Sequence, residues 1–169
     1  MDAKTLNNIL EKHKLWLHEN SIGVRADLSG ADLRWADLSG ANLSMADTDG
    51  VIHDEFTCFF SIQCPEKGSY IGYKSACGAI VELLIPDDAL RSSATSRKCR
   101  ASKATVLSIS DKEGNQLNEV PSDYSAAFVY RVGETVEVLD FDKNRWAECA
   151  PGIHHFITRK EAEAYGQKY

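Results

Sequence analysis

The residues best suited to chemistry lie between Arg91 and Lys103, which we call the basic segment. It reads Arg-Ser-Ser-Ala-Thr-Ser-Arg-Lys-Cys-Arg-Ala-Ser-Lys, with five cationic side chains, five hydroxyls and no carboxylate. Arginine offers a planar fork of donors that matches phosphate or carboxylate, and serine and threonine add adaptable donors. The basic segment therefore predicts a binding site for an anionic ligand. The alternative is a solvated loop and strand edge that is merely basic.

The predicted ligand-binding residues come from the basic segment and from three other stretches. The cations and hydroxyls are expected to bind the anion. The aromatic side chains are further candidate contacts, although packing in the core is the alternative for each. The set is Arg91, Ser92, Ser93, Thr95, Arg97, Lys98, Arg100, Tyr73, Lys74, Arg145, Trp146 and His154.

The rest of the chain is acidic. The sequence has 19 basic and 25 acidic residues, a formal net charge of −6. Setting aside the five cations of the basic segment leaves 14 against 25, or −11. Binding of long nucleic acid usually comes with a basic domain, so we expect no such partner. A local anion site remains compatible with this uneven charge.

Other kinds of site are not predicted. The sequence has no P-loop, no dinucleotide-binding glycine motif and no nucleophile elbow, so we predict no catalytic residue and no cofactor. Cys149 and His154 lack a second pair of zinc ligands, and the adjacent His154 and His155 point to opposite faces of a strand. No metal site is therefore predicted.

Size, cysteine usage and hydropathy suggest a cytoplasmic protein. A length of 169 residues fits one domain, or one domain with a small appendage. The five cysteines include no C-x-x-C pair and are interpreted as free thiols in a reducing compartment. We expect no secretory signal and no membrane-spanning segment, because no window approaches 18 apolar residues.

Hydrophobic periodicity predicts an α+β fold. An apolar stripe predicts an amphipathic helix over residues 3–19, capped by Asp2 or Thr5 and ended by Asn20 with Gly23. Residues 86–91 read as a helical turn, and residues 116–125 and 140–152 as loops. A capping box at Thr158 opens a short C-terminal helix. The predicted strands, mostly antiparallel, are residues 56–62, 70–74, 79–85, 104–109, 128–132, 135–139 and 153–157.

An internal repeat with a period of five begins at Ala26. It reads Ala-Asp-Leu-Ser-Gly, Ala-Asp-Leu-Arg-Trp, Ala-Asp-Leu-Ser-Gly, Ala-Asn-Leu-Ser-Met and Ala-Asp-Thr-Asp-Gly. The run resembles the pentapeptide-repeat family, whose members form a right-handed, four-sided β-helix with leucine pointing inward. The resemblance implies about one coil, which must stack on the N-terminal helix, the following domain or a second copy. Expected domains are the helix (1–22), the coil (23–52) and an α+β ligand-binding domain (53–169).

The chain as a whole resembles a group of bacteriophage pentapeptide-repeat proteins. The resemblance rests on the helix, the repeats, residues 68–74, 85–100 and 130–134, and the stretch 144–154. It implies a protein acting in the cytoplasm of an infected bacterium. Some small phage proteins sequester nucleotide second messengers of host defence without cleaving them, usually as homo-oligomers. We therefore expect a non-enzymatic, oligomeric binder of a small anionic nucleotide-like ligand.

Two alternatives stay open. Residues 151–158 followed by Glu161 to Tyr165 resemble the strand-then-helix segment of ADP-ribosyltransferase-like folds, which implies an enzyme acting on NAD or nucleotides. Glu134 and Glu137 lie near a predicted strand but complete no catalytic set. The other alternative is a protein–protein inhibitor that blocks a host factor.

Overall fold

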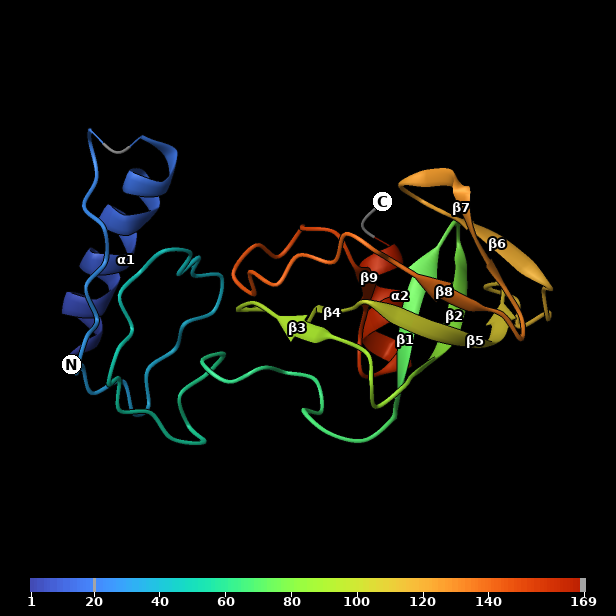
Figure 1. Ribbon diagram of the computed structural model, residues 1–169, viewed down its shortest axis with the longest axis horizontal. Coiled ribbons are helices and arrows are strands. Elements are labelled where there is room, and N and C mark those ends of the chain that lie inside the picture. Colours follow the sequence, from blue (N-terminus) through green and yellow to red (C-terminus); the bar gives the residue numbers. More distant parts are fainter. Residues whose placement is uncertain (20, 168–169) are drawn as a thin grey trace. The chain divides into compact units, whose positions relative to one another are not determined.

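The computed structural model describes residues 1–19 and 21–167 (Figure 1). The contacts divide the chain into two compact units. Unit 1 comprises Met1–Ile62, Ala94–Ser96 and Asn144–Glu148, and unit 2 comprises Gln63–Ser93, Arg97–Lys143 and Cys149–Tyr169. The three expected domains stay a prediction, and each unit is described by itself below.

Unit 1 begins with the predicted helix, α1 (Ala3–His18). The Asp2 carboxylate caps it by accepting a hydrogen bond of 2.9 Å from the Thr5 backbone N–H. His13 is fully buried, and its Nδ1 accepts from the backbone N–H of Ala26 at 3.1 Å. The helix is thereby tied to the start of the repeats. The predicted role of Asn20 in ending the helix lies outside the described residues.

The repeats wind into a coil, residues 24–60, built on turns. Every fifth residue has a positive φ between 62° and 71°, whether it is glycine, Trp35 or Met45. The Asp or Asn three residues earlier accepts a hydrogen bond from the backbone N–H two residues further on. Four leucines at this period, none more than 1% exposed, form the core: Leu28, Leu33, Leu38 and Leu43.

Three parallel bridges join successive rounds of the coil. They pair Asp27 with Asp47, Asp32 with Ile52 and Asp37 with Cys58. The described residues 24–58 form no regular strand, so a β-helix solenoid is not observed as such. The predicted strand over residues 56–62 was wrong, because Cys58 bridges Asp37 and Phe59 takes a positive φ of 64°. These residues continue the coil.

Both helix and loop segments close the leucine core. Apolar side chains of α1, with Phe60 and Trp146, pack against the four leucines. Thr95 accepts at its carbonyl from the Gly40 N–H at 3.0 Å and donates from its hydroxyl to the Ala41 carbonyl at 2.5 Å. Segments 94–96 and 144–148, distant in sequence, thus complete unit 1. Such a short coil suffices because its core is covered by other parts of the chain.

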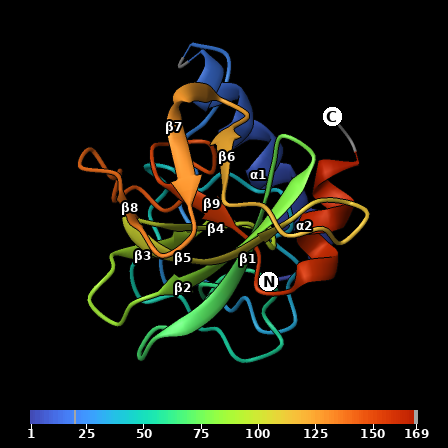
Figure 2. The ribbon, with the colours of Figure 1, turned by 90° about the vertical axis from the view of Figure 1, so that its right-hand side faces the viewer.

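Unit 2 is built from antiparallel strands. The four-stranded sheet has the order β1-β2-β5-β8, the three-stranded sheet the order β3-β4-β9, and β6 pairs with β7 (Figure 2). Every pairing between these named strands is antiparallel. The strands are β1 (Tyr70–Ala76), β2 (Ala79–Ile85), β3 (Arg91–Ser93), β4 (Cys99–Ala101), β5 (Lys103–Ser110), β6 (Glu119–Ser122), β7 (Ser125–Arg131), β8 (Thr135–Glu137) and β9 (Ile153–His155).

The turns explain two of these connections. Cys77 and Gly78 both have positive φ, 45° and 80°, and close the tight β1–β2 hairpin. Thr158 opens α2 (Arg159–Gly166) with both hydrogen bonds of the predicted capping box. The helix packs against β1, where a Cβ on Gly166 would meet the Ser75 hydroxyl.

Three sequence expectations needed correction in unit 2. The basic segment is not simply the solvated loop of the alternative interpretation, because Arg91–Ser93 and Cys99–Ala101 pair as a hairpin. The stretch 116–125, expected to be a loop, contains β6, which pairs with β7 and buries Val120. Residues 86–91 contain no helix: a turn is closed by the Ala89 N–H on the Pro86 carbonyl, and Arg91 begins β3.

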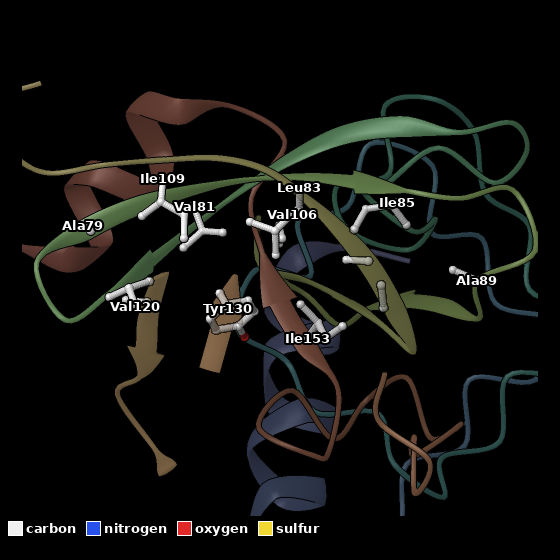
Figure 3. Close-up of a cluster of buried hydrophobic side chains, with 13 residues drawn as sticks. Ala79, Val81, Leu83, Ile85, Ala89, Val106, Ile109, Val120, Tyr130 and Ile153 are labelled. Atoms are coloured by element: carbon white, nitrogen blue, oxygen red, sulfur yellow. The ribbon is translucent and has the colours of Figure 1, made fainter. Parts of the chain in front are cut away.

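The core of unit 2 lies against the four-stranded sheet (Figure 3). Val81 and Leu83 of β2, with Val106 of β5, have no measurable exposure. Tyr130 of β7 and Ile153 of β9 meet them from the other strand groups, as the close-up shows. Side chains from these separate groups of strands thus form one buried cluster.

Leu38→Ala tests whether the leucine core stabilises unit 1. Leu38 is 0% exposed, so its truncation is expected to lower the free energy of unfolding by about 2–5 kcal/mol. All three tryptophans, Trp16, Trp35 and Trp146, belong to unit 1, so fluorescence during urea denaturation reports on this unit. Leu15→Ala, at a position 45% exposed, is the matched control and should change stability by about 0.5 kcal/mol or less. Equal effects would contradict the assigned core.

Candidate functional site

Arg91 supports the backbone of unit 2. Its guanidinium donates hydrogen bonds of 2.8–3.0 Å to the carbonyls of Pro65, Gly68, Pro86 and Asp87. It also lies 5.2 Å from the centre of the Tyr70 ring. These contacts occupy the planar fork that was expected to hold a phosphate.

Arg100 is almost completely buried, at 1% exposure. Its guanidinium donates to the carbonyls of Asp142 at 3.1 Å and Pro151 at 2.9 Å, and lies 5.2 Å from the Phe141 ring centre. It thereby ties β4 to the loop before β9. Arg97, by contrast, is exposed and forms an ion pair of 2.8 Å with Glu161.

The predicted hydroxyls are buried as well. The Ser93 hydroxyl accepts a hydrogen bond of 2.7 Å from the Gln63 N–H. The Ser92 hydroxyl is buried and makes no hydrogen bond within the described structure. Thr95 belongs to unit 1, where it bonds the coil.

Arg145 and Trp146 also belong to unit 1. The Arg145 guanidinium donates to the Phe60 carbonyl at 2.6 Å and lies 4.2 Å from the centre of the Trp146 ring. Trp146 packs against the leucine core. Both residues therefore contribute to closing the coil.

Three of the predicted residues come together in unit 2. Lys74, Lys98 and His154 line one cavity of about 320 Å³. Its remaining lining residues are Ser75, Asp123, Tyr124, Phe156 and Tyr165. Tyr73 is not among these lining residues, and its backbone pairs instead with Phe156. The cavity joins two cations, one carboxylate and three aromatic rings, which is a suitable composition for a small ligand site.

Lys74 has the most unusual position of the residues that line this cavity. It follows Gly72 on the buried face of β1, where an apolar residue would normally stand, and is only 7% exposed. In the described residues no carboxylate forms an ion pair with it, and its Nζ lies 5.8 Å from the Tyr130 ring centre. Burial lowers the pKa of Lys74 to about 8, although Asp123 acts in the opposite direction.

Lys98 brings a second cation to the cavity. It is 8% exposed, and its Nζ lies 3.8 Å from the Cys149 sulfur and 5.8 Å from the Tyr165 ring centre. Cys149 is exposed, and all five cysteines are free thiols. Two nearby ammonium groups repel each other in a buried site, which favours binding of an anion between them.

His154 contributes a hydrogen-bond acceptor. Its Nε2 lies 2.9 Å from the Ala150 carbonyl, so this nitrogen carries the proton and donates. Burial, together with the positive charges of Lys98, Lys74 and Arg100, lowers the pKa of His154 to about 4. The imidazole is therefore neutral at pH 7, and its Nδ1 can only accept. It suits a ribose hydroxyl or a base N–H better than a phosphate.

His155 holds the neighbouring strand in place. It is fully buried, and a Cβ on Gly72 would lie 2.6 Å from its Cδ2, so only glycine admits the ring. Its Nδ1 donates to the Ile153 carbonyl, and its Nε2 accepts from the Tyr70 hydroxyl at 2.9 Å. Burial lowers the pKa of His155 to about 4. Its role is to position β9, and with it His154.

A second cavity adjoins the first. It measures about 400 Å³ and shares Lys74, Tyr124 and His154 with the smaller one. Phe128, Tyr130, Val138 and Ile153 make much of its lining apolar. Tyr124, 79% exposed in the β6–β7 turn, stands at both cavities and offers a ring for stacking.

Sequence reasoning missed Asp123, Tyr124, Phe156 and Tyr165. Asp123 and Tyr124 lie in the turn between β6 and β7, in a stretch expected to be a loop. The signal that could have found them is Ser-Asp-Tyr-Ser between two β-prone runs, which is typical of a hairpin turn. A further cavity of about 360 Å³ is lined by Arg159 and Glu163, but these two already pair at 2.8 Å.

Lys74→Met tests the cost of burying this ammonium. The folded-state pKa of about 8 is below the ordinary 10.5, so the charged form destabilises the fold fully below pH 8. The cost falls as pH rises from 8 to 10.5, where the unfolded state also loses its proton. We expect Lys74→Met to stabilise by about 1–3 kcal/mol at pH 7 and by less at pH 10.5.

Urea denaturation followed by circular dichroism measures this difference. Lys67→Met, at an exposed position, is the control and should change stability little at either pH. A Lys74→Met protein that is less stable than the parent at pH 7 would show that the ammonium is favourably solvated or paired.

Comparison with known proteins gives a family but no activity. Residues 60–162 match a family of unknown function, DUF5758, and residues 24–50 match pentapeptide repeats. No curated protein and no solved structure gives a significant match. In the described residues no helix is long and apolar enough to cross a membrane, and no group of three or more His, Cys, Asp or Glu is placed to hold a metal. The DUF5758 match covers more than half of the chain and includes β1 to β9, so the protein belongs to the DUF5758 family and carries pentapeptide repeats ahead of that domain.

Proposed function

We propose that the protein is a non-enzymatic bacteriophage protein that binds and sequesters a small anionic nucleotide-like ligand. The observation that carries the proposal is Lys74, a buried ammonium without an ion-pair partner in the described residues, at the wall shared by two cavities. A buried charge is costly unless something compensates it. A bound anion would supply that compensation.

The polar groups suit the two halves of a nucleotide. Lys74 and Lys98 hold a phosphate from two sides, as point charges. The Asp123 carboxylate reduces the positive charge, but it also accepts a hydrogen bond of 2.6 Å from the Cys77 N–H. His154 accepts from a hydroxyl or a base N–H. Phosphate recognition is thus confined to the lysine side of the cavity.

The apolar cavity suits the base. Phe128, Tyr130 and Tyr124 line it beside Lys74, so a phosphate at Lys74 leaves the base facing aromatic side chains. Volumes of about 320 and 400 Å³ fit a mononucleotide or a similar small compound. A host defence signal of this size, held in the cytoplasm of an infected bacterium by an oligomer of the protein, fits the proposal.

Incubation with a panel of nucleotides, cyclic dinucleotides and ADP-ribose derivatives tests binding against catalysis. The protein is then removed by filtration or heated to denature it, and the solution is analysed by mass spectrometry. Sequestration predicts that one nucleotide disappears from the filtrate and returns intact after heating. A chemically altered product would favour the enzyme alternative, and a panel that stays entirely in solution would contradict the proposal.

Lys74→Met and His154→Ala should weaken binding of the nucleotide selected by the panel. We expect a loss of about 10- to 100-fold for Lys74→Met in titration calorimetry, the scale of a lost charge-assisted hydrogen bond. Affinity of the parent should fall as pH rises above about 8, because Lys74 loses its charge. Lys112→Met, an exposed lysine at a different cavity, is the matched control.

Arg97→Ala distinguishes two sites for the same ligand. Arg97 is the exposed arginine of the basic segment. Loss of binding in Arg97→Ala with full binding in Lys74→Met would move the ligand from the cavity to the surface of that segment.

A protein–protein role is the second candidate function. Trp35 is 72% exposed and stacks on Phe56, with ring centres 4.1 Å apart and planes 2° apart. Trp35 also adopts the positive φ that glycine takes in neighbouring repeats. Such an exposed aromatic pair fits a contact with a host factor. We further propose that residues 24–60 follow the path of the right-handed β-helix of pentapeptide-repeat proteins.

A further inference from the structure

We propose that the Lys74 amine forms a reversible imine with a phosphate-bearing aldehyde in the cavity that it shares with Lys98. This inference rests on the proposed anion site and names the chemical class of its ligand. An open-chain ribose phosphate with a free anomeric carbon belongs to this class, because its C1 is an aldehyde when the ring is open.

The first argument is the placement of the amine. Lys74 lies on the buried face of β1 with 7% exposure, and its Nζ is near the Tyr130 ring. In the described residues no carboxylate forms an ion pair that would hold the proton on this nitrogen. Lysines that react with carbonyl groups are desolvated in apolar pockets or stand beside another cation. Lys74 meets both conditions, because Lys98 lines the same cavity.

The second argument is the protonation state. Burial lowers the pKa of Lys74 to about 8, so about one tenth of the amine is neutral at pH 7. An exposed lysine with an ordinary pKa has only a few neutral molecules in ten thousand at this pH. The fraction of Lys74 that is neutral and can act as a nucleophile is therefore roughly two orders of magnitude larger than that of an exposed lysine.

The third argument is that the cavity can carry the reaction. The Nζ lone pair attacks the aldehyde carbon to give a carbinolamine, and the C–N double bond forms as the oxygen leaves. The carbonyl oxygen leaves as water, which carries the two hydrogens that the amine loses. No oxidant or reductant is needed, because the reaction is a condensation. The Lys98 ammonium can protonate the leaving hydroxyl and take a proton back afterwards. The ligand phosphate is held by Lys98, because the Lys74 nitrogen is the one that bonds to the aldehyde carbon.

Pyridoxal 5′-phosphate is a suitable probe, because it joins an aldehyde, a phosphate and an aromatic ring. The full-length protein is incubated with it at pH 7.5, reduced with borohydride and digested, and the modified lysines are identified by mass spectrometry. We expect Lys74 to be modified at least 10-fold faster than exposed Lys112. Inorganic phosphate should slow the labelling of Lys74 and leave Lys112 unaffected.

Two controls separate this inference from the anion site itself. Lys74→Arg keeps a cation but cannot form an imine, so it should lose labelling while remaining folded by circular dichroism. Pyridoxine 5′-phosphate has an alcohol in place of the aldehyde, and its binding is measured by calorimetry. Binding of pyridoxine phosphate with Lys74 labelled no faster than Lys112 overturns the imine and leaves the anion site standing. Absence of both binding and selective labelling overturns both.

Discussion

The constraint on which the rest of unit 2 depends is a buried lysine. Lys74 lies on the inward face of β1, where an apolar residue would normally stand. β1 pairs with β2 along its whole length, and its inward residues include Gly72, Lys74 and Ala76. Glycine at position 72 admits the His155 ring, and alanine at position 76 joins the apolar core. Between them Lys74 extends toward the β7 side of the core without an ion pair in the described residues. The surrounding strands fix this amine at the wall of two cavities.

The arginines that drew attention in the sequence serve the same arrangement indirectly. Arg91 holds the chain around the β1–β2 hairpin by bonding four carbonyls. Arg100 ties β4 to the carbonyls of Asp142 and Pro151, and Pro151 is close in sequence to His154. A guanidinium that bonds carbonyls in the interior stabilises loops that have no regular partners. The site that results is built on lysines, with the arginines as its support.

Much of the fold could be predicted because local patterns decide it. The spacing of the leucines predicted the coil, the Asp2 cap predicted the start of α1, and the Thr158–Glu161 capping box predicted the start of α2. The prediction of a strand over 56–62 was wrong because a short apolar run has the same sequence pattern in a strand and in a coil built from turns. β6 was missed because Glu119, Pro121 and Ser122 surround its one buried apolar residue, Val120, and its pairing with β7 is decided by tertiary contacts. The sequence also could not indicate that residues 94–96 and 144–148 close the coil.

The candidate site was predictable only in part, for a similar reason. Charge composition identified the basic segment, but composition does not reveal which arginine side chains already donate hydrogen bonds to backbone carbonyls. Lys74, Lys98 and His154 were named, whereas Asp123 and Tyr124 were hidden in a hairpin that joins the cavity only in three dimensions. Burial of the side chain, and not the number of charges nearby, distinguishes the reactive amine of Lys74 from the cations that stabilise the fold.

Direct titration of the Lys74 amine by NMR tests the central claim most directly. The Lys74 ε-carbon resonance is assigned by comparison with Lys74→Arg and followed from pH 6 to 12, with and without inorganic phosphate. A buried amine poised for an anion predicts a midpoint near pH 8 that rises when phosphate is added. A midpoint near the ordinary 10.5, unmoved by phosphate, would contradict both the burial of this charge and its role in binding.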